Sequence, residues 1–197
     1  MANHRSGWDT AARWVTRILN PAVVAVLALV TLDRMTGSPS AGVLLLAVVL
    51  GPGVPTSWAI VLRLTGRSPS VFLPDGGQRV LPLIFAVVSN GFAVWILPGM
   101  GASDAVVALM ATYGIVSLVA ALISPRWMLS LHVAGIVMPV AIGLRTFGTG
   151  TSWFLPLIPL VGWSRLRCGE HTVGQVIVGA LTGLVAAAGA ISLTLTD

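Results

Sequence analysis

Residues 162–183 read GWSRLRCGEHTVGQVIVGALTG, and they place a cluster of charged and polar side chains between two long apolar runs. The cluster contains Arg165, Arg167, Glu170 and His171. Charged groups near lipid are costly unless they face water, a partner or a ligand. In a chain in which only 9% of the residues are charged, this cluster therefore needs a specific reason.

The residue types in this cluster indicate an anion-binding site. Guanidinium groups bind phosphate oxygens in pairs, and an imidazole can act as nucleophile, acid or base. Gly169 is expected to end one helix, so that His171 lies near the N-terminus of the next, where an anion is favoured. Gln175 follows one turn later, and its amide oxygen can accept the ring N–H and fix the tautomer. The alternative interpretation is that the arginines are topology signals and His171 is simply hydrated.

The composition indicates a polytopic membrane protein with no room for a separate soluble domain. The chain has 197 residues, of which 56% are hydrophobic. Its 11 basic residues are all Arg, and they are scattered along loops, which argues against nucleic acid as a partner. The lack of Lys in a chain rich in Ala, Gly, Val and Pro is typical of a GC-rich bacterial genome. Cys168 is the single cysteine, which excludes an internal disulfide, and it is interpreted as a small filler.

The apolar runs predict an all-α bundle of about six or seven transmembrane helices, forming a single domain over residues 1–197. The segment 1–19 is predicted to be an interfacial helix, and an uncleaved anchor is preferred to a cleaved signal peptide. A Gly- and Pro-rich stretch, residues 51–55, is expected to kink the second span. The predicted spans are 19–33, 41–64, 80–98, 104–124, a span that begins near residue 130, 152–164 and 171–194.

Counting the crossings places three distant segments on one side of the membrane. The third and fourth spans form one hairpin and the fifth and sixth form another, and a hairpin returns the chain to the side that it left. The residues before the third span, which include Arg79, therefore emerge on the same side as the turn with Ser130 and His132. The stretch 165–171 emerges there too. This convergence is what a binding site requires.

The distribution of arginines predicts that this shared side is cytoplasmic. Under the positive-inside rule, the side with more basic residues faces the cytoplasm. The shared side carries nine arginines and the opposite side carries two. The bias remains when the three arginines nearest the expected site are left out. The nine are at positions 5, 13, 17, 63, 67, 79, 126, 165 and 167, and the two are at 34 and 145.

Three motifs support the anion-site interpretation further. Ser164-Arg165, five intervening residues and His171 match the pattern S-R-x5-H. Ser130-Leu131-His132 match S-x-H, and an arginine precedes the third span. Over roughly residues 60–190, the chain resembles the type 2 phosphatidic acid phosphatase superfamily of membrane lipid phosphatases, which shares its site plan with vanadium haloperoxidases.

The chain departs from that family's usual motifs at several positions. The third motif usually has Asp four residues after the His, whereas this chain has Gln175, as in a branch that carries H-T-x-x-Q. The second motif, usually P-S-G-H, has Leu129 and Leu131 in place of Pro and Gly. When the first motif is aligned on Arg79, its usual Lys position is Phe72. A neutral amide stabilises an imidazolium less well than a carboxylate does, so a lower rate is expected.

The resemblance implies a two-step phosphoryl transfer. His171 would attack phosphorus to form a phosphohistidine, and His132 would protonate the leaving alkoxide. Arg165, Arg79 and Ser130 would hold the non-bridging oxygens. Phosphoryl transfer is mainly positioning and charge stabilisation. Because the chain has only 6 acidic residues and no carboxylate pair on the shared side, a metal-dependent route is not expected and no cofactor is implied.

Three functions remain compatible with the sequence. The leading one is hydrolysis of a membrane lipid phosphate, either a prenyl phosphate or a phosphatidic-acid-like lipid, in the cell membrane. The second is ionisation or cyclisation of a prenyl diphosphate without a phosphohistidine, and the third is a non-catalytic lipid-binding subunit. Some site residues also have simpler roles: Ser130 as a helix cap, His132 as an internally satisfied histidine and Arg79 as a topology charge.

Overall fold

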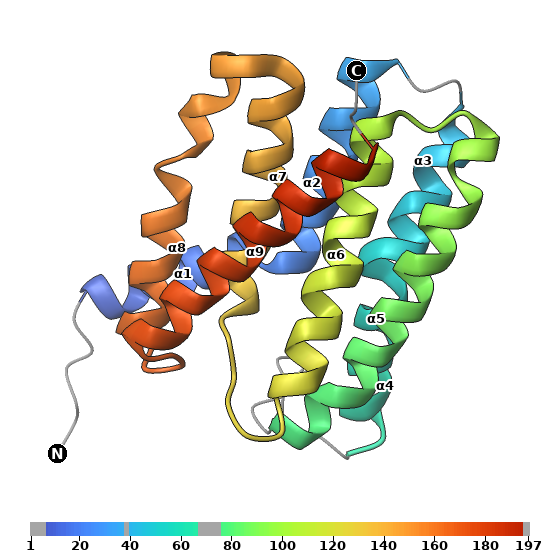
Figure 1. Cartoon of the computed structure of the whole chain (residues 1–197). Coiled ribbons are helices and arrows are strands. Elements are labelled where there is room, and N and C mark those ends of the chain that lie inside the picture. The colour runs from blue at the N-terminus through green and yellow to red at the C-terminus, as the bar shows by residue number, and fades with distance from the viewer. Residues whose placement is uncertain (1–6, 38–39, 67–75, 195–197) are drawn as a thin grey trace, which may run out of the picture.

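Helices form all the regular secondary structure in the part of the chain that the structure describes. A computed structural model describes residues 7–37, 40–66 and 76–194. The helices pack side by side as a bundle (Figure 1), which confirms the predicted all-α fold class. In chain order the elements are α1 (Gly7–Ile18), α2 (Pro21–Thr36), α3 (Ala41–Val48), the π-helical segment η1 (Val49–Gly53), α4 (Val54–Leu64), α5 (Gly76–Ile96), the 3-10 segment η2 (Pro98–Met100), α6 (Asp104–Ile123), α7 (Leu131–Phe147), the 3-10 segment η3 (Gly148–Phe154), α8 (Leu157–Arg167) and α9 (Val173–Thr194).

Five helical stretches within the described residues are long and apolar enough to cross a membrane, which indicates a membrane protein. Counting the bent pair α1–α2 as one span raises the number to six. The predicted span at 152–164 is instead a 3-10 segment followed by α8, whose 11 residues extend only about 16 Å. A predicted total of seven spans is therefore not confirmed. The five stretches are Ala41–Leu64, Arg79–Ile96, Asp104–Ile123, Leu131–Phe154 and Val173–Thr194.

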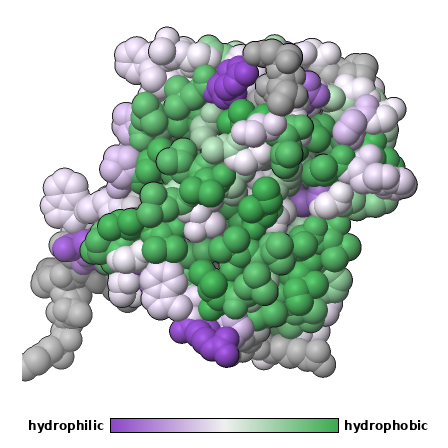
Figure 2. All heavy atoms as spheres, in the orientation of Figure 1, coloured by the Kyte–Doolittle hydropathy of each residue, from purple (hydrophilic) through white to green (hydrophobic). Residues whose placement is uncertain are grey.

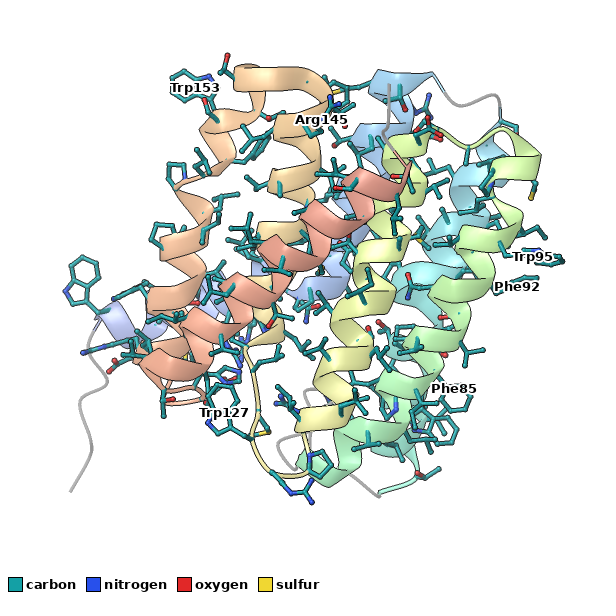
Figure 3. All side chains as sticks on the ribbon, viewed as in Figure 1. Phe85, Phe92, Trp95, Trp127, Arg145 and Trp153 are labelled. Carbon is teal, nitrogen blue, oxygen red and sulfur yellow. The ribbon has the colours of Figure 1, made fainter. Side chains whose placement is uncertain are left out.

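The surface of the bundle agrees with a membrane environment. Figure 2 shows hydrophobic residues across the middle of the visible face and most of the strongly hydrophilic patches near its edges. In Figure 3, Phe92 and Trp95 project outward from α5, and Trp127 and Trp153 lie near opposite ends of the bundle. Tryptophans gather at both membrane–water interfaces, so the positions of Trp127 and Trp153 fit a bundle that spans a membrane from end to end.

The second predicted span contains a π-helical turn at the position of its glycines and prolines. Residues 41–64 are helical throughout, but Val49–Gly53 form a π-helical turn with Pro52 inside it. Proline has no N–H to donate, and such turns are common at functional sites. Gly51 lets this turn pack closely, because a Cβ there would lie 3.1 Å from Cε of Met110 on α6.

The amphipathic N-terminal segment forms the helix that the sequence predicted, and this helix packs on α8. The axes of α1 and α2 differ by 50°. Asn20 caps α2, since its Oδ1 accepts a hydrogen bond from the Ala22 N–H at 2.8 Å. On the other side of α1, Thr16 Oγ1 donates to Ser164 Oγ at 3.2 Å. The helix α1 therefore braces the segment that carries Arg165.

Glycines let α9 cross α7 at very short range. A Cβ at Gly179 would lie 2.6 Å from the backbone oxygen of Ser130, and one at Gly183 would lie 3.1 Å from that of Ala134. Small residues four apart permit such close helix crossings in membrane proteins. The Ser130 N–H also donates to the Gln175 backbone oxygen at 3.1 Å. This crossing fixes the start of α7 against the start of α9.

Candidate functional site

Four of the predicted site residues line one pocket at one end of the bundle. Arg79 comes from the first turns of α5, His132 from the first turn of α7, Arg165 from the last turn of α8 and His171 from the turn between α8 and α9. In Figure 1 the start of α5, the α6–α7 connection and the α8–α9 turn all lie toward the lower edge. The convergence of three distant segments, predicted by counting crossings, is found.

Arg165 is the most deeply buried charge of this site. Its side chain is 2% exposed, and its Nη2 donates to Glu170 Oε2. Its Nε and Nη1 have no hydrogen-bond partner among the residues that the structure describes. Buried donors on a charged group are costly to leave unpaired. Arg165 also lines a pocket, so its unpaired Nε and Nη1 are candidate donors to the oxygens of an anion bound there.

Glu170 is the site residue that sequence reasoning gave no role. It is 44% exposed, and it reaches Arg165 because Gly169, with φ of 68°, turns the chain back after α8. The Glu170 N–H donates to the backbone oxygen of Arg165 at 3.2 Å, which closes this turn. A glycine just after a helix end is the signal that could have revealed the contact.

Gln175 is placed as the sequence predicted, and it has a second role. Its Oε1 lies 3.1 Å from His171 Nδ1 and also accepts the Thr172 N–H at 3.1 Å. In return the Gln175 N–H donates to Thr172 Oγ1 at 3.4 Å, which completes a capping box at the start of α9. A backbone N–H can only donate, so the shared atom is the amide oxygen and the proton of His171 is on Nδ1. Its Nε2 is therefore left with a free lone pair.

Burial lowers the pKa of His171 below its ordinary value of 6.5. The hydrogen bond to Gln175 opposes this shift, the positive charges of Arg165 and Arg79 add to it, and the carboxylate of Glu170 opposes it. The net effect keeps the imidazole neutral near pH 7. A neutral imidazole with a free Nε2 lone pair is the form that can act as a nucleophile.

Ser130 and His132 lie at the start of α7. Ser130 occupies the N-cap position, but its side chain makes no capping hydrogen bond. Its hydroxyl is fully buried and without a hydrogen-bond partner among the described residues. The simpler interpretation of Ser130 as a side-chain cap is therefore wrong. His132 is also buried, and its ring lines the pocket.

Other residues of the charged cluster do not join the pocket. Arg167 donates from its Nε to Asp9 Oδ1 of α1 at 2.8 Å, and it is not among the residues that line the pocket. The Cys168 sulfur lies 4.0 Å from Thr16 Oγ1 and is half-buried, which agrees with a filler role. Phe72, at the position of the usual Lys in the first motif, lies outside the described residues, as does Arg67.

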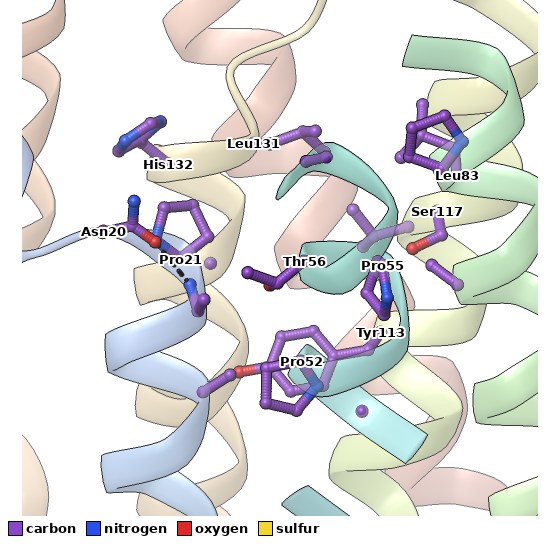
Figure 4. A pocket seen from close by; sticks show the side chains of 18 of the residues that line it. Asn20, Pro21, Pro52, Pro55, Thr56, Leu83, Tyr113, Ser117, Leu131 and His132 are labelled. Carbon is purple, nitrogen blue, oxygen red and sulfur yellow. Dashed lines mark hydrogen bonds between the residues drawn. The ribbon is translucent and has the colours of Figure 1, made fainter. Parts of the chain in front are cut away.

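Beyond the charged end, the pocket extends between the helices and is mostly apolar. Its volume is about 260 Å³. Figure 4 shows His132 at one end of the labelled set and Tyr113 and Pro52 at the other. Sequence reasoning did not single out Asn90 and Tyr113, two of the polar residues that line its interior. A polar side chain in the middle of an apolar span is the signal that could have done so.

The arrangement is chemically suited to an anion that is joined to an apolar group. Arg79, Arg165, His132 and the neutral imidazole of His171 line a pocket whose other walls are mostly apolar, whereas Ser130 is not among the lining residues. No family model, no curated protein and no solved structure matches the chain. The site and the sequence motifs are therefore the basis for a proposed function.

Proposed function

We propose that this chain is a membrane lipid phosphatase with the chemistry of the type 2 phosphatidic acid phosphatases. It hydrolyses a lipid phosphate through a phosphohistidine and needs no divalent metal. The observation that carries this proposal is the buried guanidinium of Arg165, whose Nε and Nη1 have no partner among the described residues. Arg165 lines the same pocket as His171, whose Nε2 is left free by the hydrogen bond between Nδ1 and Gln175.

In the first step, the Nε2 lone pair of His171 attacks phosphorus as the bond between phosphorus and the lipid oxygen breaks. That oxygen takes a proton from the protonated ring of His132 and leaves as an alcohol. In the second step, a water attacks the phosphohistidine and gives one proton to His132, which is now neutral. Inorganic phosphate leaves and His171 is regenerated. Each step transfers one proton to or from one histidine, as general acid–base catalysis requires.

Charge stabilisation in both steps comes from the side chains that surround phosphorus. Arg165 offers the unpaired N–H groups of Nε and Nη1, and Arg79 lines the same pocket as a second cation. In this proposal the Ser130 hydroxyl, at the start of α7, donates to a remaining oxygen. Such donors act most strongly in a site of low dielectric constant that excludes water. Among the described residues, no three His, Cys, Asp or Glu side chains lie close enough together to hold a metal ion. The arginines are the cations that these residues offer to the phosphate.

The apolar part of the pocket and the membrane-spanning helices support a lipid as the substrate. A phosphate held by Arg165 would have its organic substituent directed into the bundle, where the lining is mostly hydrocarbon. We place the site at the cytoplasmic face of the cell membrane, because nine of the arginines belong to that end of the predicted topology.

The test is phosphate release by the purified protein from a panel of prenyl phosphates and phosphatidic acids. We expect turnover by the wild type, and loss of more than about 10³-fold in His171→Ala, since a nucleophile has no substitute. With an activated aryl phosphate as substrate, the leaving phenolate needs no proton from His132. The phosphohistidine should therefore form in His132→Ala and accumulate, because the variant lacks the base for its hydrolysis. A hydrocarbon or cyclic product would instead identify a prenyl-diphosphate-ionising enzyme. Binding without turnover in the wild type would identify a lipid-binding subunit.

A further inference from the structure

The inner end of the pocket is polar, and the sites already described do not use it. Asn90 on α5 is 2% exposed, and its Nδ2 donates to the Ala86 backbone oxygen at 2.8 Å. Its Oδ1 has no hydrogen-bond partner among the residues that the structure describes, and neither does the hydroxyl of Tyr113 on α6. Both side chains line the pocket. Two oxygens there are thus left to a ligand or to water.

These oxygens lie far from the phosphate-binding end. Arg79, Leu83, Ala86 and Asn90 all line the pocket from one face of α5. Eleven residues of α-helix separate the first from the last, which is about 16 Å along the helix axis. A Cβ built on Gly114 would lie 3.5 Å from Cβ of Asn90, so the Tyr113 backbone is at the same depth. Figure 4 shows Tyr113 beside Pro52, at the end opposite to His132.

The walls between the two ends favour a single hydrocarbon chain. They are formed largely by apolar side chains, among them Pro55, Leu83 and Met138. The volume of about 260 Å³ is below the roughly 300–1,000 Å³ of pockets that enclose drug-sized ligands. This space suits a phosphate with part of one chain, and it is small for the two chains and the ester groups of a diacyl lipid.

We propose that this pocket takes the phosphate ester of a single hydrocarbon chain, and that Tyr113 and Asn90 form a polar floor that limits how much of the chain is enclosed. The proposal rests on the proposed function for the phosphate end and adds the specificity for the tail. Each methylene that enters the apolar section gains affinity. A chain end that reached the floor would displace water from two oxygens and leave them buried without a partner, which is unfavourable.

The test is the Kd of the purified protein for straight-chain alkylphosphonates, from butyl to hexadecyl, at a fixed detergent concentration. Phosphonates are not hydrolysed, so the result does not depend on turnover. We expect Kd to fall about fourfold for each added methylene and then to level off or rise at one length. In Tyr113→Phe, which keeps the ring and removes the hydroxyl, chains beyond that length should bind about tenfold more tightly, whereas shorter chains should bind as in the wild type.

Two further variants make the result decisive. Asn90→Leu should shift long-chain binding in the same direction, and it covers the case in which Tyr113→Phe does not fold. Thr112→Val is the matched control: Thr112 is also buried on α6 and donates to the Ala108 backbone oxygen at 2.7 Å, but it does not line the pocket. This control should leave the length profile unchanged.

Three results would overturn the proposal. The first is a Kd that falls through the whole series in the wild type. The second is a limiting chain length that is the same in the wild type, Tyr113→Phe and Asn90→Leu, and the third is tighter binding of a two-chain phosphonate.

A different outcome would separate the two proposals. If the limiting chain length shifts as expected but the protein releases no phosphate from any lipid, the polar floor is supported and the phosphatase function is refuted.

Discussion

Gln175 Oε1 accepts one hydrogen bond from the His171 ring and one from the Thr172 backbone N–H, both at 3.1 Å. A single neutral amide thus caps helix α9 and sets the tautomer of the imidazole. The carboxylate that is usual at this position in the resembling family would offer the same two hydrogen bonds and a negative charge. A substitution of Gln175 by Glu therefore changes the charge beside His171 and keeps the two acceptor positions.

Replacing Gln175 with Glu should move the pH dependence of the reaction. A carboxylate beside Nδ1 stabilises the imidazolium and so raises the pKa of His171, which burial holds below 6.5 in the wild type. The neutral imidazole then becomes the main form only at higher pH, so the ascending limb of the single-turnover rate should shift upward. Gln175→Ala should lower the plateau of that rate by about 10²-fold, because the ring is no longer oriented. It should also shift the ascending limb to lower pH, because the hydrogen bond that raises the pKa of His171 is lost.

Thr172→Ala is the matched control for this pair. It removes the hydroxyl that accepts the Gln175 N–H at 3.4 Å, and so it weakens the helix cap without touching the imidazole. Its cost should be about 1 kcal/mol of stability, with little change in the single-turnover rate. If Gln175→Ala behaves like Thr172→Ala in both rate and stability, Gln175 is only a capping residue.

Glu170→Gln should have the opposite effect on the pH profile. Glu170 raises the pKa of His171, so neutralising it should shift the ascending limb to lower pH. The amide still reaches Arg165 and accepts its N–H, which keeps the guanidinium in place. The site also gains net positive charge, so inorganic phosphate should inhibit several-fold more strongly. Steady-state inhibition and pH–rate measurements would check both effects, and weaker phosphate inhibition would contradict this account of Glu170.

Gly179→Ala should separate α9 from α7. The added Cβ would lie 2.6 Å from the Ser130 backbone oxygen, a contact that only movement of a helix can relieve. We expect a loss of about 2 kcal/mol or more in stability and a large loss of activity, because the same crossing places Gln175 against Ser130. Gly189→Ala on the same helix is the control, since nothing lies within 4 Å of its added Cβ. Gly189→Ala should leave the activity unchanged, and it should leave the melting temperature unchanged or raise it slightly.

Single cysteines should reveal which side of the membrane the site faces. In a Cys168→Ser background, Thr65→Cys marks the end of α4 near the site, and Trp153→Cys marks the opposite end, where the side chain is 86% exposed. An impermeant thiol reagent should label Trp153→Cys in intact cells and label Thr65→Cys only after permeabilisation. The reverse pattern would place the site on the outer face.

Chelation of divalent metals should leave phosphate release unchanged. The positive charge in the pocket is supplied by Arg79 and Arg165. The assay is phosphate release from a lipid phosphate before and after EDTA, with magnesium added back to a second sample. Activity that falls on chelation and returns with magnesium would count against an arginine-based site.

Much of the site could be predicted because its residues lie where apolar runs stop. Arg79, Ser130, His132 and His171 all stand at the edges of such runs, so hairpin geometry was enough to bring their ends together. The contact of His171 with Gln175 was predicted from i,i+4 spacing on one helix. The contact is present, but His171 precedes α9 and the contact is made at the capping box. These are local relationships, and the sequence carries local relationships directly.

Other features depend on packing, which the sequence expresses weakly. The contact of Glu170 with Arg165 requires a turn whose path is set by Gly169. Asn90 and Tyr113 belong to different helices, and they line one pocket only because particular faces of α5 and α6 meet. The span predicted at 152–164 is not one continuous helix, because residues 152–154 belong to a 3-10 segment and α8 begins only at Leu157.

The packing of α1 on α8 also fixes when the site can be completed during synthesis. Thr16 and Ser164 are 148 positions apart, and Asp9 and Arg167 are 158 positions apart. The ribosome therefore synthesises α1 long before α8, and α1 has no contact with α8 while the helices between them are made. The contacts between α1 and the helix that carries Arg165 can form only after α8 has been synthesised. A bulky fusion at the N-terminus that held α1 away during this interval would leave a bundle whose helices are inserted but whose anion site is loose.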